Sequence, residues 1–417
     1  MDVDTGVSAS CTAGEGSKIL VIGAGCTGLA LAHGLKTAGI PYAVYESRSN
    51  VAPLKRDWSF GLHWSAPALQ SLIPTELWAM IQSTQVDPHT PTKDVETLRF
   101  HNGRTGELIR GVEVERFYRL RRSKLQALLS EGLDIEWEKE MVDIIHLEDE
   151  KGVKAIFEDG TEVTGSMLVG ADGTRSSVRS LLVGCDSAKP TPIDFATTMC
   201  FSKYSRDRAL FLRSAPHQPL FQTAPHPDGY FSWLGLHDAS DTDHPESWVF
   251  QHYISFPEPR EFENKKTVAE HVAHQKAMAS QFADPWRSSF EWIPDDTTTA
   301  WYGKLNHWDP ALPEHKWNNQ GGLITLAGDA AHPMTFQRGQ GLNHALTDSV
   351  KLCKAIVDCW HSSEGFQSGR AAAIEGYEKE MIARASEELR LGELNSRMLH
   401  DWEQVQQSPT FGKGLSR

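Results

Sequence analysis

A glycine-rich turn near the start of the chain has the residue types and spacing of a phosphate-binding loop. Gly23, Gly25 and Gly28 follow an apolar run at residues 18–22 and open a predicted helix at residues 29–38. The first glycine permits a tight turn, the second lets the backbone approach a pyrophosphate, and the third lets the helix pack on the strand. The helix N-terminus adds free N–H groups and a positive dipole end. These features predict a dinucleotide site.

An acidic residue closes the next predicted strand, at residues 42–45. The carboxylate of Glu46 can accept hydrogen bonds from both hydroxyls of a ribose. An acid at this position, where an arginine would suit a phosphate, argues that this ribose carries no 2′-phosphate. The order strand, helix, strand predicts a parallel βαβ unit.

Two later motifs also follow apolar strands. Residues 170–179 read GADGTRSSVR and contain Asp172, and residues 328–333 read GDAAHP and contain Asp329. Residues 338–343 then read RGQGLN. Each motif alone could be a solvated turn, because Asp-Gly pairs are common in turns. Three strand-end motifs in this order are hard to explain as unrelated turns.

With these motifs the chain resembles the class A flavoprotein monooxygenases, which have the para-hydroxybenzoate hydroxylase fold, and most of all their fungal secondary-metabolite members. The resemblance covers roughly residues 18–400. It implies that the dinucleotide is FAD and that NADPH or NADH is the co-substrate. It also implies an aromatic or polycyclic small-molecule substrate and molecular oxygen as partners. The implied reaction is hydroxylation or epoxidation through a flavin C4a-hydroperoxide, in secondary-metabolite biosynthesis.

The resemblance also assigns roles to three acidic residues. Glu46 would hold the adenosine ribose of FAD, and Asp329 would bind the ribityl chain. Asp172 would help to hold FAD and would serve the nicotinamide cofactor.

At the flavin ring, the resemblance points to a second glycine-containing turn. Gly341, Leu342 and Asn343 would place backbone N–H groups on the flavin pyrimidine edge. Reduced flavin carries negative charge at this edge, and a helix N-terminus stabilises such charge. Arg122, ahead of a predicted helix at residues 122–131, matches the arginine with which the family contacts FAD. Its neighbour Arg121 is a rival for that role, and an exposed charge at a helix start is the alternative.

Two departures from the family pattern concern the substrate side. Where the family usually has a proline over the flavin, four residues after the histidine of GDAAH, this chain has Phe336. The bulky stretch 56–64 replaces a glycine-rich strand, and within it Arg56 or His63 could bond a substrate oxygen or act as an acid. The alternative is a surface Arg56 paired with Asp57, and a structural histidine. No nucleophile–base triad is evident, which suits chemistry carried by the cofactor.

The predicted fold is α/β, a Rossmann-type FAD-binding domain with an inserted mixed-sheet substrate domain and C-terminal helices. Residues 185–228 are rich in Pro and Ser and predict loops between short strands. Seven tryptophans between 233 and 317 predict core packing, with some of them lining a pocket for a flat substrate. The predicted divisions are a disordered leader (1–16), a first FAD-binding part with interleaved substrate-domain segments (17–184), a substrate domain (185–305), a return to the FAD-binding domain (306–362) and a C-terminal helical segment (363–417).

Composition narrows the partners. The chain has 41 Lys and Arg against 55 Asp and Glu, a net charge of −14, and such a surface repels nucleic acid and anionic membranes. Six scattered cysteines without a CxxC pair predict no metal site and reduced thiols. No apolar run approaches a membrane span, so a cytoplasmic protein is expected. A reductase, a dehydrogenase, a halogenase or a non-catalytic FAD-binding protein on the same fold stay open as alternatives.

Overall fold

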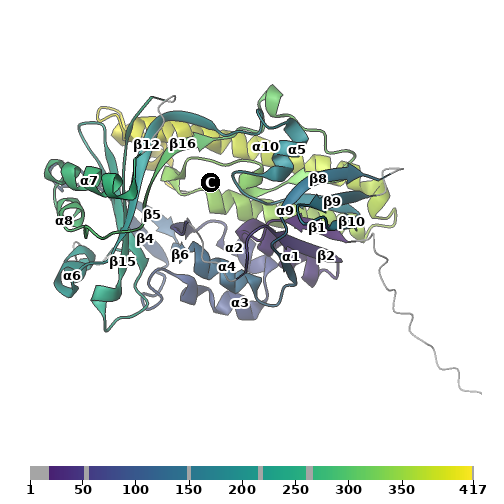
Figure 1. Ribbon diagram of the computed structural model, residues 1–417, viewed down its shortest axis with the longest axis horizontal. Coiled ribbons are helices and arrows are strands. Elements are labelled where there is room, and N and C mark those ends of the chain that lie inside the picture. Colours follow the sequence, from purple (N-terminus) through teal and green to yellow (C-terminus); the bar gives the residue numbers. More distant parts are fainter. Residues whose placement is uncertain (1–17, 51–55, 148–151, 215–218, 260–265, 416–417) are drawn as a thin grey trace, which may run out of the picture.

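The computed structural model describes residues 18–50, 56–147, 152–214, 219–259 and 266–415, so the predicted leader at 1–16 lies outside the described residues. Two lobes lie side by side, and the long helix α10 (Phe366–Leu399) runs along both of them (Figure 1). One lobe is built on a parallel sheet and the other on a mixed sheet. The α/β fold expected from the sequence is confirmed.

The parallel sheet carries the predicted βαβ unit at its centre. Its strand order is β17-β11-β1-β2-β7, and every neighbouring pair is parallel. The strands β1, β11 and β17 are buried along their whole length, as a sheet covered on both faces requires. The bounds are β1 Ile19–Ile22, β2 Tyr42–Glu46, β7 Ile135–Trp137, β11 Met167–Gly170 and β17 Ile324–Leu326.

Helices and a small antiparallel sheet cover this parallel sheet. Helix α1 packs against α2, α4 and α9, and α9 packs against α10. The predicted helices at residues 29–38 and 122–131 are confirmed as α1 and α4. The bounds are α1 Cys26–Thr37, α2 Ala66–Leu72, α3 Thr75–Ala79, α4 Arg122–Ser130, α5 Ser177–Val183 and α9 Gly341–Trp360, with β8 Met141–His146, β9 Val153–Phe157 and β10 Glu162–Gly165 in the small sheet.

The second lobe is a seven-stranded sheet in the order β16-β12-β15-β14-β13-β4-β5. It is mixed because β13 and β4 run parallel while its other pairs are antiparallel. The helices α6, α7 and α8 lie on its outer side (Figure 1). The bounds are β4 Val95–His101, β5 Leu108–Glu115, β12 Thr191–Ser202, β13 Phe221–Pro225, β14 Phe231–Asp238, β15 Val249–Pro257 and β16 Ala300–His307, with α6 Arg206–Ser214, α7 Val268–Met278 and α8 Trp286–Glu291.

The prediction of loops between short strands at residues 185–228 is wrong in its main part. Strand β12 runs for 12 residues and is the inner strand between β15 and β16, and α6 follows it. Its last eight residues are all buried, so it shows no alternation of polar and apolar residues. The flanking prolines gave the stretch the composition of a loop, while the apolar run between them forms a central strand.

A two-stranded ladder connects the lobes. Strand β3 (Ser59–Leu62) pairs antiparallel with β6 (Tyr118–Arg121), and β6 leads directly into α4. In the part of the chain that the structure describes, no helix is long and apolar enough to cross a membrane.

Candidate active site

The glycine turn between β1 and α1 is shaped by close backbone contacts. Gly23 has φ +106°, and a Cβ there would lie 2.5 Å from the carbonyl oxygen of Ala171. A Cβ on Gly28 would lie 2.1 Å from the carbonyl oxygen of Gly23. At Gly25 the nearest atom would be 3.9 Å away, which leaves room for a ligand. No side chain among the described residues caps the start of α1, so its first N–H groups are available to an anion.

Glu46 at the end of β2 faces this turn. Its Oε2 accepts a hydrogen bond from the Ala24 N–H at 2.8 Å, and its Oε1 accepts from the Arg48 backbone N–H at 3.1 Å. The side chain of Gln126 on α4 donates to the Ala24 carbonyl. These bonds hold the carboxylate beside the turn, where the resemblance expects a ribose.

Asp172 follows β11 and has one oxygen without a partner. Its Oδ2 accepts from the backbone N–H groups of Ser177 at 2.7 Å and Val178 at 3.2 Å, which caps α5. Its Oδ1 is buried and has no hydrogen-bond partner among the described residues. Burial raises the pKa of the Asp172 carboxyl. A buried acceptor without a donor is costly, and a hydroxyl of a bound cofactor would satisfy it.

Asp329 follows β17 and lies close to two arginines. Its Oδ2 accepts from the Thr174 hydroxyl at 3.4 Å. Burial raises the pKa of its carboxyl, and the charges of His332, Arg122 and Arg179 oppose that rise.

Arg179 on α5 joins the two acidic loops, and sequence reasoning did not single it out. It is 1% exposed, and its guanidinium lies 5.0 Å from the centre of the Trp308 ring. It donates to the backbone carbonyls of Thr174, Ala188, Asp329 and Ala330. Its guanidinium therefore fixes the loops that follow β11 and β17 and has these carbonyls as its partners. Only its position in the 170–179 motif signalled a role.

The turn at the start of α9 is held by Asn343, which is completely buried. Its Oδ1 accepts from the His63 N–H at 3.1 Å and the Ser65 hydroxyl at 2.8 Å. Its Nδ2 donates to the Gly61 carbonyl at 3.0 Å and the Gly339 carbonyl at 3.2 Å. Gly341 and Leu342 form the first turn of α9, and the helix has no side-chain cap. In the described part of the chain no side chain occupies its first N–H groups, which can therefore donate to a ligand, and the contact of residues 341–343 with the flavin stays a prediction.

His63 contacts this turn with its side chain. Its Nε2 lies 2.9 Å from Asn343 Nδ2 and 3.4 Å from the Gly339 carbonyl oxygen. Burial, reinforced by the charge of Arg338, lowers the pKa of His63 to about 4. The imidazole is therefore neutral at pH 7 and braces the turn, as the structural alternative expects.

Arg56 does not pair with Asp57, contrary to the alternative weighed for it. Its guanidinium is exposed and lies 5.6 Å from the centre of the Trp301 ring. Asp57 instead accepts from Arg121 Nε at 2.8 Å and from the Ser123 N–H at 3.1 Å. Burial would raise the pKa of Asp57, but His237, Ser123 and Arg121 hold it well below its usual range.

The two candidates for the arginine that contacts FAD, Arg122 and Arg121, have different partners. Arg121 is fixed by two carboxylates, those of Asp57 and Asp238. Arg122 donates to the Arg56 carbonyl at 3.1 Å and lies 4.7 Å from the centre of the Trp58 ring. Burial raises the pKa of both Cys26 and Asp329, and the charge of Arg122 opposes this rise at each of them, which places Arg122 near the glycine turn. The geometry favours Arg122 as the arginine that faces FAD.

A buried ionic network lies behind the GDAAH loop. Asp348 on α9 is completely buried and accepts from His332 Nε2 at 2.6 Å and from the Gly328 N–H at 2.8 Å. Arg384 on α10 donates to its other oxygen at 2.6 Å. Burial would raise the pKa of Asp348, but His332 and Arg384 lower it to about 2. His332 is therefore held by Asp348 inside this network.

Aromatic rings extend from this turn into the second lobe. Neighbouring ring centres lie 5.3–6.0 Å apart. In order, this aromatic row is His63, Phe117, Phe221, Trp233, Tyr253 and Phe336. Phe336 is 42% exposed, so the residue that replaces the family's proline ends the row at the surface. Trp286 and Trp308 are fully buried and fill cores, as expected for most of the tryptophans.

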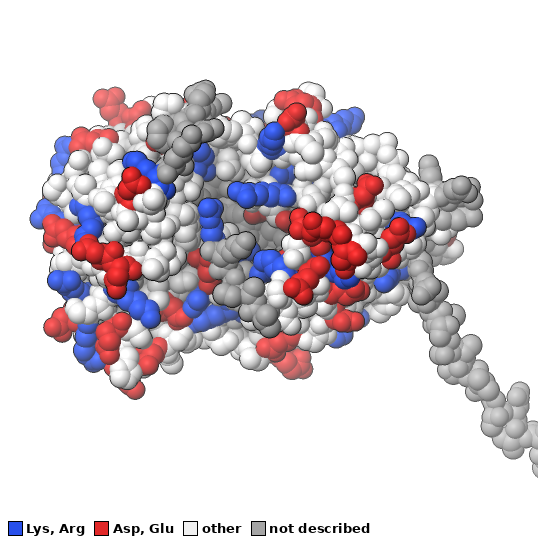
Figure 2. Space-filling model, viewed as in Figure 1, with Lys and Arg blue, Asp and Glu red and all other residues white. Residues whose placement is uncertain are grey.

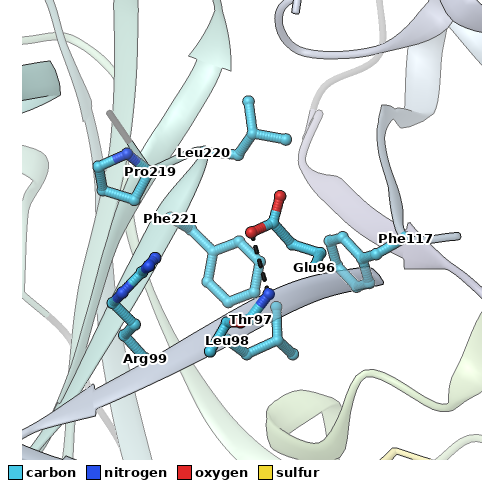
Figure 3. Close-up of a pocket in the computed structure, with 8 residues that line it drawn as sticks. All are labelled: Glu96, Thr97, Leu98, Arg99, Phe117, Pro219, Leu220 and Phe221. Carbon is cyan, nitrogen blue, oxygen red and sulfur yellow. Dashed lines mark hydrogen bonds between the residues drawn. The ribbon is translucent and has the colours of Figure 1, made fainter. Parts of the chain in front are cut away.

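A small pocket lies beside this row. Phe117 and Phe221 form its inner wall together with residues of β4, and Glu96 bends back to accept from the Thr97 N–H at 3.0 Å (Figure 3). On the outside, a hollow opens between the lobes and Lys and Arg side chains lie along its rim (Figure 2).

Comparison with known proteins agrees with this geometry. The FAD binding domain family matches residues 17–387. The FAD-dependent monooxygenase cctM of Talaromyces islandicus is 36% identical over 402 residues, 96% of this chain and 97% of its own length. The FAD-dependent monooxygenase phnB of Penicillium herquei is 36% identical over 404 residues, 95% of this chain and 94% of its own.

A solved structure shows the same fold. Klebsiella pneumoniae HpxO, in complex with FAD and uric acid, superposes with a TM-score of 0.71 at 19% identity. The match covers 96% of this chain and 93% of HpxO. From the family match, the relatives and the shared fold, the chain belongs to the FAD-binding-domain family and is an FAD-dependent monooxygenase of class A.

Proposed function

We propose that this enzyme uses NADPH or NADH and oxygen to hydroxylate or epoxidise a flat aromatic or polycyclic molecule in secondary metabolism. The observation that carries the proposal is the aromatic row, which ends against Asn343 at the turn expected to hold the flavin ring. Stacked rings bind flat hydrophobic molecules. Uric acid, the ligand of HpxO, is also a planar ring system.

FAD, when bound, supplies the redox chemistry between the nicotinamide, oxygen and the substrate. The chain's own residues hold it along one path. Glu46 accepts from the adenosine ribose, and the open face at Gly25 admits the pyrophosphate. Asp172 Oδ1 and Asp329 accept from hydroxyl groups farther along.

At the reacting end, the start of α9 stabilises negative charge on the flavin pyrimidine edge. His63 and Asn343 keep that turn in place without supplying a proton, since the pKa of His63 lies well below neutral. The aromatic row excludes water from the space above.

The test follows oxygen atoms. The FAD-loaded enzyme is reduced by NADPH or NADH without air, and ¹⁸O₂ is then admitted with candidate indole and polyketide scaffolds. Mass spectrometry should find one ¹⁸O atom in a product, and substrate should accelerate nicotinamide oxidation. Products formed without oxygen would instead identify a reductase or dehydrogenase, and chloride-dependent products a halogenase. Either result would overturn the proposal.

A further inference from the structure

Arg119 on β6 is half-buried, and its contacts differ from those of the fully buried arginines. Arg213 pairs with Asp87, Arg338 with Glu388, and Arg179 donates to four carbonyls. No ion pair joins Arg119 to any carboxylate in the described part of the chain. Its only side-chain hydrogen bond there is from Nε to the Ser59 hydroxyl, at 3.1 Å.

Two aromatic rings take the place of a counter-ion. The Arg119 guanidinium lies 4.7 Å from the centre of the Trp233 ring and 5.1 Å from that of Phe221. Burial lowers the pKa of Arg119 to about 9, and only the Tyr253 hydroxyl opposes this. A ring face contacts the plane of the guanidinium and stabilises its charge less than a carboxylate would. Because the rings accept no conventional hydrogen bonds from Arg119, its two terminal nitrogens can still donate to a ligand.

The ladder between the lobes places this cation close to the α9 turn. Arg119 pairs across the ladder with Gly61, and the Gly61 carbonyl accepts from Asn343 Nδ2 at 3.0 Å. Strand alternation puts Phe117 on the same face as Arg119, and Phe117 stacks on His63. The cation therefore lies within the aromatic row, one strand away from the turn.

A half-buried cation without a counter-ion loses part of its hydration uncompensated, and a planar guanidinium favours an anionic oxygen that it can contact with two nitrogens. We propose that Arg119 binds an anionic oxygen of a planar aromatic substrate, a phenolate or a ring carboxylate, while Trp233 and Phe221 stack on its ring. This inference rests on the proposed function, because it assigns the substrate end of the same site. It makes Arg119 a residue that selects charged over neutral ring systems.

The test measures binding, without turnover. FAD-loaded enzyme is titrated by calorimetry with three two-ring probes: 2-naphthoate, 4-nitro-1-naphtholate and the neutral 2-acetylnaphthalene. The wild type should prefer at least one anion to the neutral probe. In Arg119→Met that anion should bind about 10- to 100-fold more weakly, while the neutral probe changes by less than about twofold. The anion that binds more tightly shows whether Arg119 prefers the oxygen of a phenolate or that of a ring carboxylate.

Two variants control the result. Arg119→Lys keeps a charge and should recover part of the preference. Arg110→Met removes an exposed arginine that also lies over a ring, 5.9 Å from the centre of Phe411, and should leave every affinity unchanged. The FAD content and melting temperature of each variant show whether it folds.

Equal wild-type affinity for anions and the neutral probe would overturn the inference. So would failure of both anions to bind, or a preference that survives in Arg119→Met with its FAD content intact. None of these outcomes bears on oxygen insertion, which the ¹⁸O₂ experiment decides separately.

Discussion

The two sides of the active site treat buried charge in opposite ways. Behind the expected FAD site, Asp348 is bonded to His332 and Arg384, and Arg179 is saturated with carbonyls. On the substrate side, Arg119 faces two rings and one hydroxyl. Behind the expected FAD site these charges are paired within the protein, so that this part is preorganised before a ligand arrives, whereas the buried Oδ1 of Asp172 still lacks a donor among the described residues. The substrate side leaves one charge for the ligand to complete.

The strongest test of the preorganised side is Gly28→Ala. Its new Cβ would lie 2.1 Å from the Gly23 carbonyl oxygen, and backbone cannot yield cheaply. FAD affinity should fall by more than about 100-fold, because the glycine turn must deform. The ratio of flavin to protein absorbance measures this. Gly376→Ala, at an open position on α10, should retain FAD, and equal FAD content in the two variants would refute the steric argument.

Asp348→Asn tests the saturated network. Removing one partner of a buried ionic network should cost about 3–5 kcal/mol of unfolding free energy. Since the pKa of Asp348 is lowered to about 2, its contribution is present above pH 3.8 and is lost as pH falls from about 4 to 2. Melting curves against pH should therefore show a steeper acid loss in the wild type than in the variant.

Asp358→Asn, which breaks the exposed pair with Lys354, is the matched control and should change stability by less than about 1 kcal/mol. Parallel acid profiles for the wild type and Asp348→Asn would mean that the network does not stabilise the fold.

Substitutions of the neighbouring residues Arg122 and Arg121 distinguish an arginine that binds FAD from one that only forms internal ion pairs. Arg122→Met should weaken FAD binding about tenfold, and the weakening should shrink at high salt, since a partly exposed charge is screened. Arg121→Met should leave FAD affinity nearly unchanged but lower the melting temperature, because it removes one partner each from Asp57 and Asp238. Fluorescence titration of the apoprotein with FAD distinguishes the two. The reverse pattern would exchange their roles.

The smallest expected effect lies in the aromatic row. Trp233→Leu should raise the Kd of a flat substrate about 3- to 10-fold through lost stacking, with FAD content unchanged. Trp402→Leu replaces a 37% exposed tryptophan outside the row and should have no effect on binding. Substrate affinity that is insensitive to Trp233 would remove the row from the binding site.

The cofactor side was predictable because its constraints are local. A glycine whose Cβ would collide with backbone, or an acid at the end of a parallel strand, appears in the sequence as a motif with fixed spacing. The contacts of His63 with Asn343 and of Arg179 with Asp329 leave none, because they join residues 280 and 150 positions apart. Arg119 was missed for the same reason. Arginine is a common residue, and what distinguishes Arg119 is that no carboxylate of the described residues forms an ion pair with it. Only the folded structure shows this.

The place of β17 in the parallel sheet has a consequence for how the enzyme is made. This strand lies beside β11, yet five of the seven strands of the second lobe's sheet, β12 to β16, lie between the two in the sequence. A growing chain therefore forms the glycine turn early and must wait for residues 324–343 before the cradle closes. We expect FAD to bind the finished chain in preference to any partial one, because only the finished chain has both parts of the cradle. By linkage it stabilises the native state in proportion to RT ln(1 + [FAD]/Kd), so the supply of flavin sets how much of the enzyme survives in its folded form.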